Sequence, residues 1–524
     1  MSKGKIIGII IAAVVIVGGI GAATVHAESK GTSSQEKNQI VVALPSAPLT
    51  MNPMYANIRS SQAVSSALYE NLFNISNNGT IEYNGLAKSL THSADCKTYT
   101  LTLKPNLKWS DGKPLTASDV VFTFNQIMNT KQNALDTQSF IIDNKPVTCK
   151  EINSTTVQFN LPAPTLGFKY DLISLIPIPE HIYKGVQDIQ TDKANNDPIG
   201  DGPYKFVSEV KGSLIKLTRN PYFEGTPAKI ENLDFRIIPN NTANIAALKS
   251  GQVDVSLIAP NEISELQNDF NFQTFASGLV NHITFNLNVP VLKNIKVREA
   301  IAYALNRNDL ITASATSTKY AQPAYSTFAP QTEDYTADVT KYDQNIDKAK
   351  ELLKESGEKN ITLKLAYGTG VQGMKEEAEV IQQELEKVGI KVEIMPMNTN
   401  AFYTDLLSKT SQTFDLGLNR YNMGNDPDSY AQEFVTGQAD NCSKISNKEI
   451  DQLFAKAQTM TNEADRAQIF KEIQQKISEQ LPIYTISYPD TVIATRKGIE
   501  GIKEAQLAPM IMFNNFGELY YENK

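Results

Sequence analysis

The chain has 524 residues and a formal net charge of −8, with 49 Lys and Arg against 57 Asp and Glu. This length is enough to bury the cores of two or three domains. The mild acidity argues against nucleic acid as a partner, because nucleic-acid binding needs a basic face. Strands and helices are interleaved along the sequence, which indicates an α/β architecture of packed layers.

The N-terminus has the features of an export signal. Lys3 and Lys5 precede 19 uncharged residues, 6–24, and Val25-His26-Ala27 then resembles a small-x-small cleavage site. We expect a signal peptide over 1–27 that is removed on export. The uncharged stretch is also about long enough to span a bilayer, so a retained membrane anchor is the alternative. No cysteine lies in this stretch, so we do not expect a lipoprotein.

A linker and a first strand follow the export signal. Residues 28–38 are polar and contain Gly, Ser and Lys, which is typical of a flexible linker. The apolar run Gln39-Ile-Val-Val-Ala-Leu44 then predicts a strand. No later segment of the sequence is apolar over a length that would span a membrane.

The region from 87 to 124 contains a strand, a turn and a capped helix. Residues 99–103 alternate as a half-buried strand does. Residues 110–113 have turn chemistry, in which Gly112 is free to take a positive φ. Thr116 can cap the helix that follows, and Asp119 falls in its first turn, where a carboxylate is favoured.

Residues 346–396 predict a β-α-β unit preceded by a helix. The leading helix ends at Gly357, a residue suited to a helix C-terminus. Strands over 361–367 and 390–394 alternate in hydrophobicity, and apolar residues recur at helical spacing over 374–388 between them. We expect the crossover to be right-handed and the strands to be parallel.

Three cysteines, Cys96, Cys149 and Cys442, are few for a secreted chain. In an oxidising compartment one disulfide is possible, and Cys96 and Cys149 are the expected pair because they fall in the same predicted domain. Three unpaired thiols are the alternative.

Several segments of the sequence share motifs with one known family. They resemble the signature of the extracytoplasmic solute-binding proteins of oligopeptide and dipeptide ABC importers, bacterial solute-binding family 5. The matching segments are Trp109-Ser-Asp-Gly112, Thr116-Ala-Ser-Asp-Val120, Pro198-Ile-Gly-Asp-Gly-Pro-Tyr204, Arg219-Asn-Pro-Tyr-Phe223, Ala247-Leu-Lys-Ser-Gly-Gln-Val-Asp254, Val297-Arg-Glu-Ala-Ile-Ala-Tyr-Ala304 and Leu481-Pro-Ile-Tyr484. Asp201 stands where the family has threonine. The resemblance covers roughly residues 40 to 505 in the family's order.

The resemblance implies a fold and a domain map. The fold is α/β and two-lobed, of the periplasmic-binding-protein type, with discontinuous domains and an extra subdomain in lobe I. The chain would cross between the lobes near 284–287 and near 485–488. The implied ranges are 39–60, 194–283 and 487–524 for lobe I, 61–193 for the extra subdomain and 284–486 for lobe II.

The resemblance also implies a function. The protein would capture oligopeptides in a cleft between the lobes and deliver them to a membrane permease and its ATPase. We expect a monomer without a cofactor, exported to the outer face of the cytoplasmic membrane or to the periplasm. A peptide or pheromone sensor, or a binder of an anionic or sugar-like solute, are the alternatives with the same fold.

The expected binding segment departs from the family. In relatives a carboxylate for the peptide α-ammonium lies three residues before an acidic-Pro pair, in a stretch of the type Trp-x-x-Asp-x-x-Asp-Pro. With Asp426-Pro427 as the anchor, the carboxylate position is Met423 and the tryptophan position is Arg420. A thioether is uncharged and only a weak acceptor, so it cannot hold an ammonium.

Three explanations of this departure remain open. Asp426 or Asp428 holds the ammonium, or the peptide N-terminus is blocked or lies outside, or the ligand is not a peptide. Arg420 would suit a carboxylate or another anion, although a merely solvated arginine is equally compatible with the sequence. The ligand-binding candidates are Asn57, Arg420, Tyr421, Met423, Asp426 and Tyr488.

The sequence does not favour an enzyme. It contains no His-Glu-x-x-His, no Gly-x-Ser-x-Gly and no glycine-rich phosphate loop. Its four histidines are His26, His92, His181 and His282, and the first falls in the expected signal peptide. A histidine-based metal site or a serine triad is therefore poorly supplied, and we expect no catalytic residues and no metal.

Overall fold

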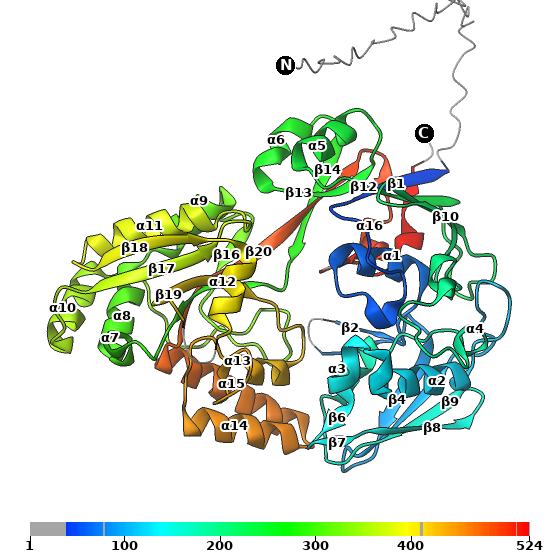
Figure 1. Cartoon of the computed structure of the whole chain (residues 1–524), viewed down its shortest axis with the longest axis horizontal. Helices are drawn as coiled ribbons and strands as arrows, with labels where there is room; N and C mark the ends of the chain where they lie inside the picture. Colours follow the sequence, from blue (N-terminus) through cyan, green and yellow to red (C-terminus); the bar gives the residue numbers. More distant parts are fainter. Residues whose placement is uncertain (1–37, 77–78, 409–411, 510, 523–524) are drawn as a thin grey trace, which may run out of the picture. The chain divides into compact units, whose positions relative to one another are not determined.

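One long strand, β20 (Ile483–Arg496), belongs to a twelve-stranded sheet and joins its two parts (Figure 1). The structure, a computed structural model, describes residues 38–76, 79–408, 412–509 and 511–522. The first half of β20 pairs with β15 (Val280–Phe285), and its second half pairs with β14 (Phe270–Ala276). The two halves of this strand therefore have different neighbours.

The strands of this sheet form two sets. One set has the order β10-β11-β12-β1-β13, the other has the order β15-β19-β17-β18, and β20 joins them; β14 and β16 also pair with β20. Together with the helices between the strands, this confirms the expected α/β class. The remaining bounds are β1 (Gln39–Leu44), β10 (Tyr204–Val210), β11 (Leu214–Arg219), β12 (Asn232–Ile237), β13 (Val255–Ile258), β16 (Ala321–Pro323), β17 (Thr362–Gly368), β18 (Lys391–Met397) and β19 (Leu416–Tyr421).

The strand pairing bears on the expected lobe boundaries. All of β15 pairs with β19 of the second set. The chain therefore passes from β14 to the second set through residues 277–279, a few residues before the boundary expected at 283. On β20 the pairing passes from β15 to β14 between Ser487 and Asp490, beside the boundary expected at 486. The lobe ranges themselves stay a prediction.

The β-α-β unit is present in the expected order. α10 (Ile346–Ser356) ends at Gly357, whose φ of 75° is the left-handed conformation that a helix cap needs and that glycine adopts without strain. β17 and β18 pair in parallel on either side of α11 (Met374–Glu386). The apolar period of 3.6 in α11 matches its buried face, which explains why this unit was predictable.

A second sheet lies within the range expected for the extra subdomain. It is antiparallel, with the order β4-β5-β9-β8. The helix α2 (Ala117–Met128) contacts it and begins with the expected cap, because Asp119 accepts from the Thr116 amide at 2.9 Å while the Thr116 hydroxyl accepts from Ser118. The strand bounds are β4 (Ala87–His92), β5 (Thr98–Leu103), β8 (Thr148–Asn153) and β9 (Thr156–Asn160).

The expected disulfide between Cys96 and Cys149 is not formed, and all three cysteines are free thiols. Cys149 lies on β8, opposite Phe159 of β9, and Phe159 in turn lies opposite Tyr99 of β5. Two strand spacings of roughly 4.8 Å therefore separate Cys149 from β5. Cys96 lies in the turn before β5, so the two thiols are too far apart, because a disulfide requires Cα atoms within about 7 Å.

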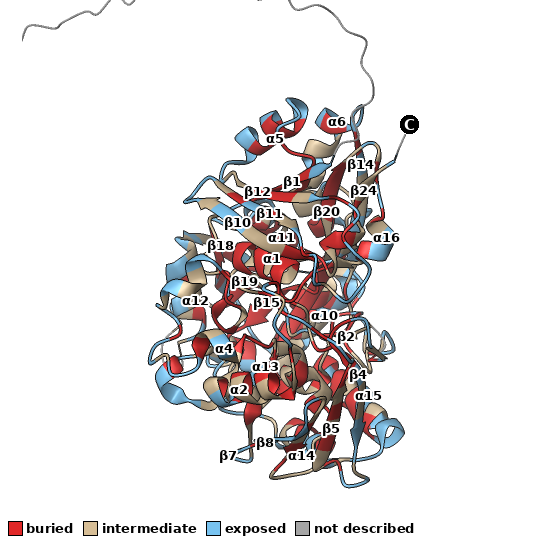
Figure 2. Ribbon diagram, turned by 90° about the vertical axis from the view of Figure 1, so that its right-hand side faces the viewer, coloured by how far each residue is buried: buried red, intermediate tan, exposed pale blue. Residues whose placement is uncertain are grey.

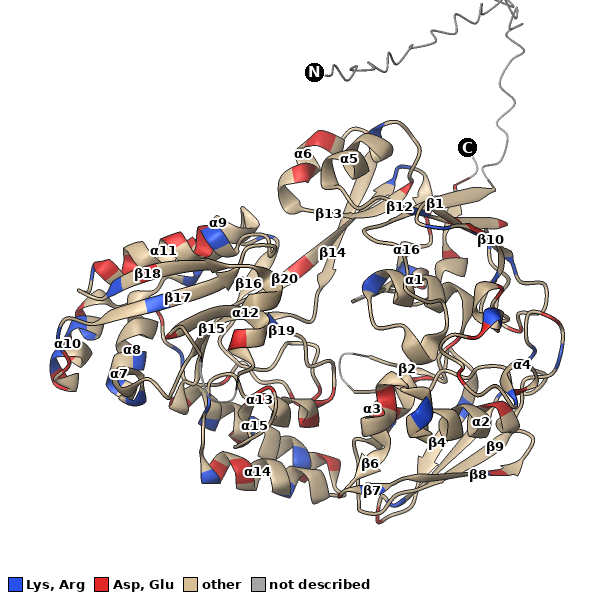
Figure 3. Ribbon diagram, in the orientation of Figure 1, with Lys and Arg blue, Asp and Glu red and all other residues tan. Residues whose placement is uncertain are grey.

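The apolar side chains pack into several cores, and Figure 2 shows the buried residues in red. The first core contains Phe168 and Phe235, the second contains Ile283 and Leu365, and the third contains Tyr430 and Phe470. Charged residues are frequent along helices such as α10 and α11 (Figure 3), and two of those in α11, Glu377 and Glu384, are buried. The chain thus forms more than one separately packed core, as its length predicts.

The remaining helices and strands are short or connect these units. The helices are α1 (Arg59–Leu68), α3 (Phe168–Asp171), α4 (Glu180–Tyr183), α5 (Asn241–Lys249), α6 (Ile263–Leu266), α7 (Pro290–Lys293), α8 (Ile295–Ala304), α9 (Arg307–Ala315), α12 (Thr399–Leu406), α13 (Ala431–Phe434), α14 (Lys448–Thr459), α15 (Glu463–Gln480) and α16 (Ile502–Ala505). The strands are β2 (Asn74–Ile75), β3 (Ile81–Glu82), β6 (Ile141–Ile142), β7 (Lys145–Pro146), β21 (Ile499–Glu500), β22 (Leu507–Ala508), β23 (Met512–Phe513) and β24 (Tyr520–Tyr521).

The predicted signal peptide over 1–27 and almost all of the predicted linker over 28–38 lie outside the described residues. Among the residues that the structure does describe, no helix combines the length and the apolar character needed to cross a bilayer.

Candidate ligand-binding site

The candidate segment begins on the last residues of β19 and ends on a short helical turn. Arg420 and Tyr421 close β19, which pairs with β15 so that Arg420 lies opposite Asn281. A loop then leads to the 3₁₀ turn η7 (Pro427–Tyr430). Asp426 caps this turn, because its side chain accepts a hydrogen bond from the Asp428 amide at 3.0 Å. Proline at the first position and an aspartate cap explain why the turn forms here.

Two of the predicted residues, Tyr421 and Tyr488, are buried tyrosines. The Tyr421 hydroxyl donates to the Thr327 carbonyl at 2.5 Å, and the Tyr488 hydroxyl donates to the Ser326 carbonyl at 2.7 Å. Burial raises the pKa of both phenols well above the ordinary value. Both side chains therefore hold the 326–327 backbone in place, and their hydroxyls are already used.

Met423 and Asn57 are more accessible to solvent than the two tyrosines. Met423 is half-buried and packs against the third core, which also contains Tyr421 and Tyr488. The structure thus brings these three predicted residues together. Asn57 is exposed, in the turn before α1, where its amide donates to the Tyr55 carbonyl at 3.0 Å.

Arg420 is a partly buried cation with unused hydrogen-bond donors. Its Nη2 donates to the Gln372 carbonyl at 3.3 Å, and its Nε is buried without a partner among the described residues. Burial lowers the pKa of Arg420, although the nearby Glu377 opposes this.

Glu377, the carboxylate whose charge acts on Arg420, is hydrogen-bonded to another residue. Glu377 is fully buried, and its two oxygens accept from Asn281 Nδ2 at 2.7 and 2.9 Å. Burial raises the pKa of Glu377, so its negative charge is disfavoured there. An unsatisfied buried donor is costly, and an anion from outside the chain would satisfy Arg420.

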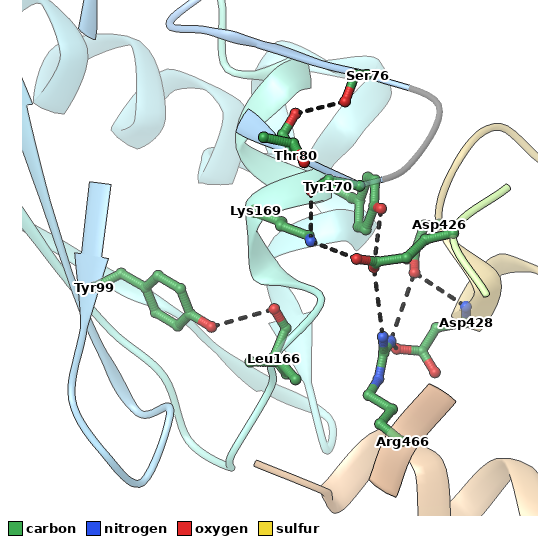
Figure 4. Close-up of polar contacts among 11 residues, drawn as sticks. Ser76, Thr80, Tyr99, Leu166, Lys169, Tyr170, Asp426, Asp428 and Arg466 are labelled. Carbon is green, nitrogen blue, oxygen red and sulfur yellow. Dashed lines mark hydrogen bonds and ion pairs between the residues drawn. The ribbon is translucent and has the colours of Figure 1, made fainter. Parts of the chain in front are cut away.

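Asp426 and Asp428 are not free acids, because both lie beside Arg466 of α15 (Figure 4). Arg466 Nη2 is 2.5 Å from Asp428 Oδ2 and 3.8 Å from Asp426 Oδ1. Burial, and then the charge of Asp428, raise the pKa of Asp426 to about 7. Arg466 thus already supplies a cation to both acids, while Asp428 Oδ1 is a buried acceptor without a partner among the described residues.

Arg466, Glu333 and Lys169 were not predicted from the sequence as part of this site. Arg466 Nη1 is also 3.8 Å from Glu333 Oε2, and Glu333 Oε1 is 2.8 Å from Lys169 Nζ of α3. One signal was available, because Arg466 shares a helical face with Ile469, Phe470 and Ile473. A charged residue on an apolar face requires a buried partner.

Among the described residues no cluster of His, Cys, Asp and Glu has the arrangement of a metal site.

Known proteins share both the sequence and the fold of this chain. Residues 83–442 match the family described as "Bacterial extracellular solute-binding proteins, family 5 Middle". The oligopeptide-binding protein AppA of Bacillus subtilis is 27% identical over 91% of this chain and 91% of its own length. The dipeptide-binding protein of Escherichia coli is 27% identical over 90% of this chain and 92% of its own.

Two solved structures are similar over nearly the whole chain. The ABC transporter substrate-binding protein CtaP of Listeria monocytogenes is 36% identical, with a TM-score of 0.89, over 93% of this chain and 100% of that one. A putative peptide-binding protein, AppA of Clostridium difficile, is 36% identical, with a TM-score of 0.86, over 92% and 100%. These relatives are named as binding proteins rather than as enzymes. Both the sequence and the two-lobed fold therefore place this chain in family 5 of the bacterial extracellular solute-binding proteins.

Proposed function

We propose that this protein is the extracytoplasmic substrate-binding component of a peptide ABC transporter. It captures oligopeptides between its two lobes and delivers them to a membrane permease with its ATPase. The observation that carries this proposal is the similarity, over about nine tenths of the chain, to relatives named as oligopeptide- and dipeptide-binding proteins. The protein acts as an exported monomer without a cofactor.

The site geometry narrows how a peptide would be held. The candidate acids Asp426 and Asp428 already lie beside Arg466, and Met423 carries no charge. The peptide ammonium is therefore not held by an acid of the 423–428 segment, and it is either blocked or directed to solvent. Backbone hydrogen bonds to an extended peptide supply affinity that does not depend on side-chain sequence.

Arg420 is the proposed anchor for the peptide's negative charge. Its buried Nε has no partner among the described residues, and its guanidinium can form two parallel hydrogen bonds with one carboxylate. The peptide's C-terminal carboxylate or an acidic side chain supplies that group. The same feature favours a second candidate function, the binding of an anionic solute that is not a peptide.

A calorimetric screen tests the proposal. Mixed peptides of 2–10 residues would be titrated in four forms: unmodified, N-acetylated, C-amidated and doubly modified. We expect binding that survives acetylation and weakens on amidation. Absence of binding by every peptide pool, together with binding of a non-peptide anion, would replace the peptide function with the second candidate.

A further inference from the structure

A cluster of charged side chains connects two separately packed cores of the protein. Lys169 and Tyr170 belong to α3, whose Phe168 packs in the first core. Arg466 belongs to α15, whose Phe470 packs in the third core. Because the two cores are distinct among the described residues, contacts in this cluster connect elements that pack in different cores.

Glu333 lies at the centre of the contact. Its Oε1 is 2.8 Å from Lys169 Nζ, and its Oε2 accepts from the Tyr170 hydroxyl at 3.0 Å. Its segment belongs to the third-core side, because the hydroxyl of its neighbour Thr332 is 3.1 Å from that of Tyr430. One carboxylate thus binds both Lys169 and Tyr170 of α3.

The pair is well shielded from water. The Lys169 and Glu333 side chains are 14% and 18% exposed, whereas typical surface pairs of this protein, such as Lys296 with Glu355, are 43% and 48% exposed. A shielded ion pair with short, charge-assisted hydrogen bonds is stronger than an exposed one. Lys169 Nζ also donates to the Gly79 carbonyl at 2.9 Å.

The backbone of the first-core side comes unusually close to the acids at Gly167. A Cβ atom at this position would lie 3.2 Å from Asp428 Oδ2 and 3.3 Å from Arg466 Nη2. Gly167 has a φ of −71°, so its backbone does not require glycine. The absence of a side chain here therefore serves the close approach of the two surfaces.

We propose that the Lys169–Tyr170–Glu333 contact, supported by Arg466, Asp426 and Asp428, is a latch that holds the two lobes together before ligand binds. The latch also sets the affinity for ligand. A protein that already populates its binding-competent arrangement spends less binding free energy on reaching that arrangement. The second statement rests on the proposed peptide-binding function, whereas the first does not.

Lys169→Met is the sharpest variant. It keeps an unbranched apolar stem and removes the ammonium with its contacts to Glu333 and Gly79, while the Arg466 pairs within the third-core side remain. Tyr170→Phe removes the second bond to Glu333 and keeps the ring. Lys296→Met is the matched control, because it makes the same substitution at an exposed ion pair that does not connect the first and third cores.

Small-angle X-ray scattering of the ligand-free chain measures the latch directly. We expect a larger radius of gyration for Lys169→Met, a smaller increase for Tyr170→Phe and none for Lys296→Met. Circular dichroism would verify that each variant is folded; if Lys169→Met does not fold, Tyr170→Phe carries the test. Identical scattering from the natural protein and the folded latch variants would overturn the latch.

Calorimetry with a peptide that binds the natural protein tests the second statement. We expect roughly tenfold weaker binding by Lys169→Met and unchanged binding by Lys296→Met. If Lys169→Met has a larger radius of gyration but binds the peptide as tightly as the natural protein, the proposed effect of the latch on affinity is overturned. If no peptide binds the natural protein, the proposed function fails while the scattering result still decides the latch.

Discussion

Arg420 is partly buried and Arg466 is buried, and both lie near the same acidic segment, yet their surroundings are opposite. Arg466 is 3% exposed and has three carboxylates within 4 Å, and although burial lowers its pKa, the charges of Asp428 and Asp426 raise it overall. Arg420 has one carbonyl at 3.3 Å, and burial lowers its pKa. The chain satisfies the Arg466 guanidinium internally and leaves Arg420 Nε without a partner among the described residues, which is why we propose Arg420, and not Arg466, as the ligand anchor.

The largest expected effect is on stability. Arg466→Met removes the cation shared by Asp426, Asp428 and Glu333, and breaking a buried pair in this way costs about 3–5 kcal/mol. Arg420→Met leaves no internal carboxylate unpaired, so it should cost no more than about 1 kcal/mol. Urea unfolding of both variants measures the difference, and equal losses would show that the two arginines are not distinct.

A smaller effect is expected on binding. Arg420→Gln removes a charge-assisted hydrogen bond to the ligand, worth about 1.5–3 kcal/mol, or roughly 10- to 100-fold in affinity. The loss should disappear for a C-amidated peptide without acidic side chains. Calorimetry of one peptide in both forms gives this comparison, and an equal loss for both forms would contradict a contact between Arg420 and the carboxylate.

The third prediction concerns pH. Burial, and then Asp428, raise the pKa of Asp426 to about 7, from an ordinary value near 3.8, while Arg466 opposes the shift and Glu333 adds to it. Because the folded-state pKa is raised, the folded state is relatively more stable below pH 4, and this advantage is lost as the pH rises through 7.

Asp426→Asn removes this dependence while its side-chain oxygen can still cap η7. The variant should therefore gain stability over the natural protein between pH 5 and pH 8, by an amount on the order of 1–3 kcal/mol. Thermal unfolding across this range measures the gain. A stability difference that does not change with pH would refute a raised pKa at Asp426.

The smallest expected effect is at Met423. Met423→Asp places an acid where the family resemblance implies the partner of the peptide ammonium, so peptides with a free N-terminus should bind a few-fold more tightly. N-acetylated peptides should bind the variant and the natural protein alike. Calorimetry with both forms makes the comparison, and tighter binding of the acetylated form would exclude an ammonium contact.

Local patterns allowed much of the fold to be predicted. The Thr116 cap with Asp119, the positive φ of Gly112 and the β-α-β unit ending beyond α11 depend on residues only a few positions apart. Propensity, capping and hydrophobic period act at that range. The family motifs extended this local information to the whole chain.

Contacts between distant residues could not be predicted in the same way. Asp428 and Arg466 are 38 positions apart, and Lys169 and Glu333 are 164 apart, so no local pattern shows that these charges meet. The disulfide prediction was wrong for the same reason. Both cysteines fall in one predicted domain, but the sequence does not show that β9 lies between β8, which carries Cys149, and β5, which follows Cys96. Arg466, the partner of the candidate acids Asp426 and Asp428, could therefore be identified only from the three-dimensional structure.

Native mass spectrometry of the protein, purified from its own host without refolding, identifies what the protein carries. We expect bound masses that fragment as peptides on the natural protein, and a marked loss of these masses on the Arg420→Gln variant. Peptide-free protein that retains a non-peptide anion, or equal peptide occupancy of both proteins, would contradict the account of a peptide held through Arg420.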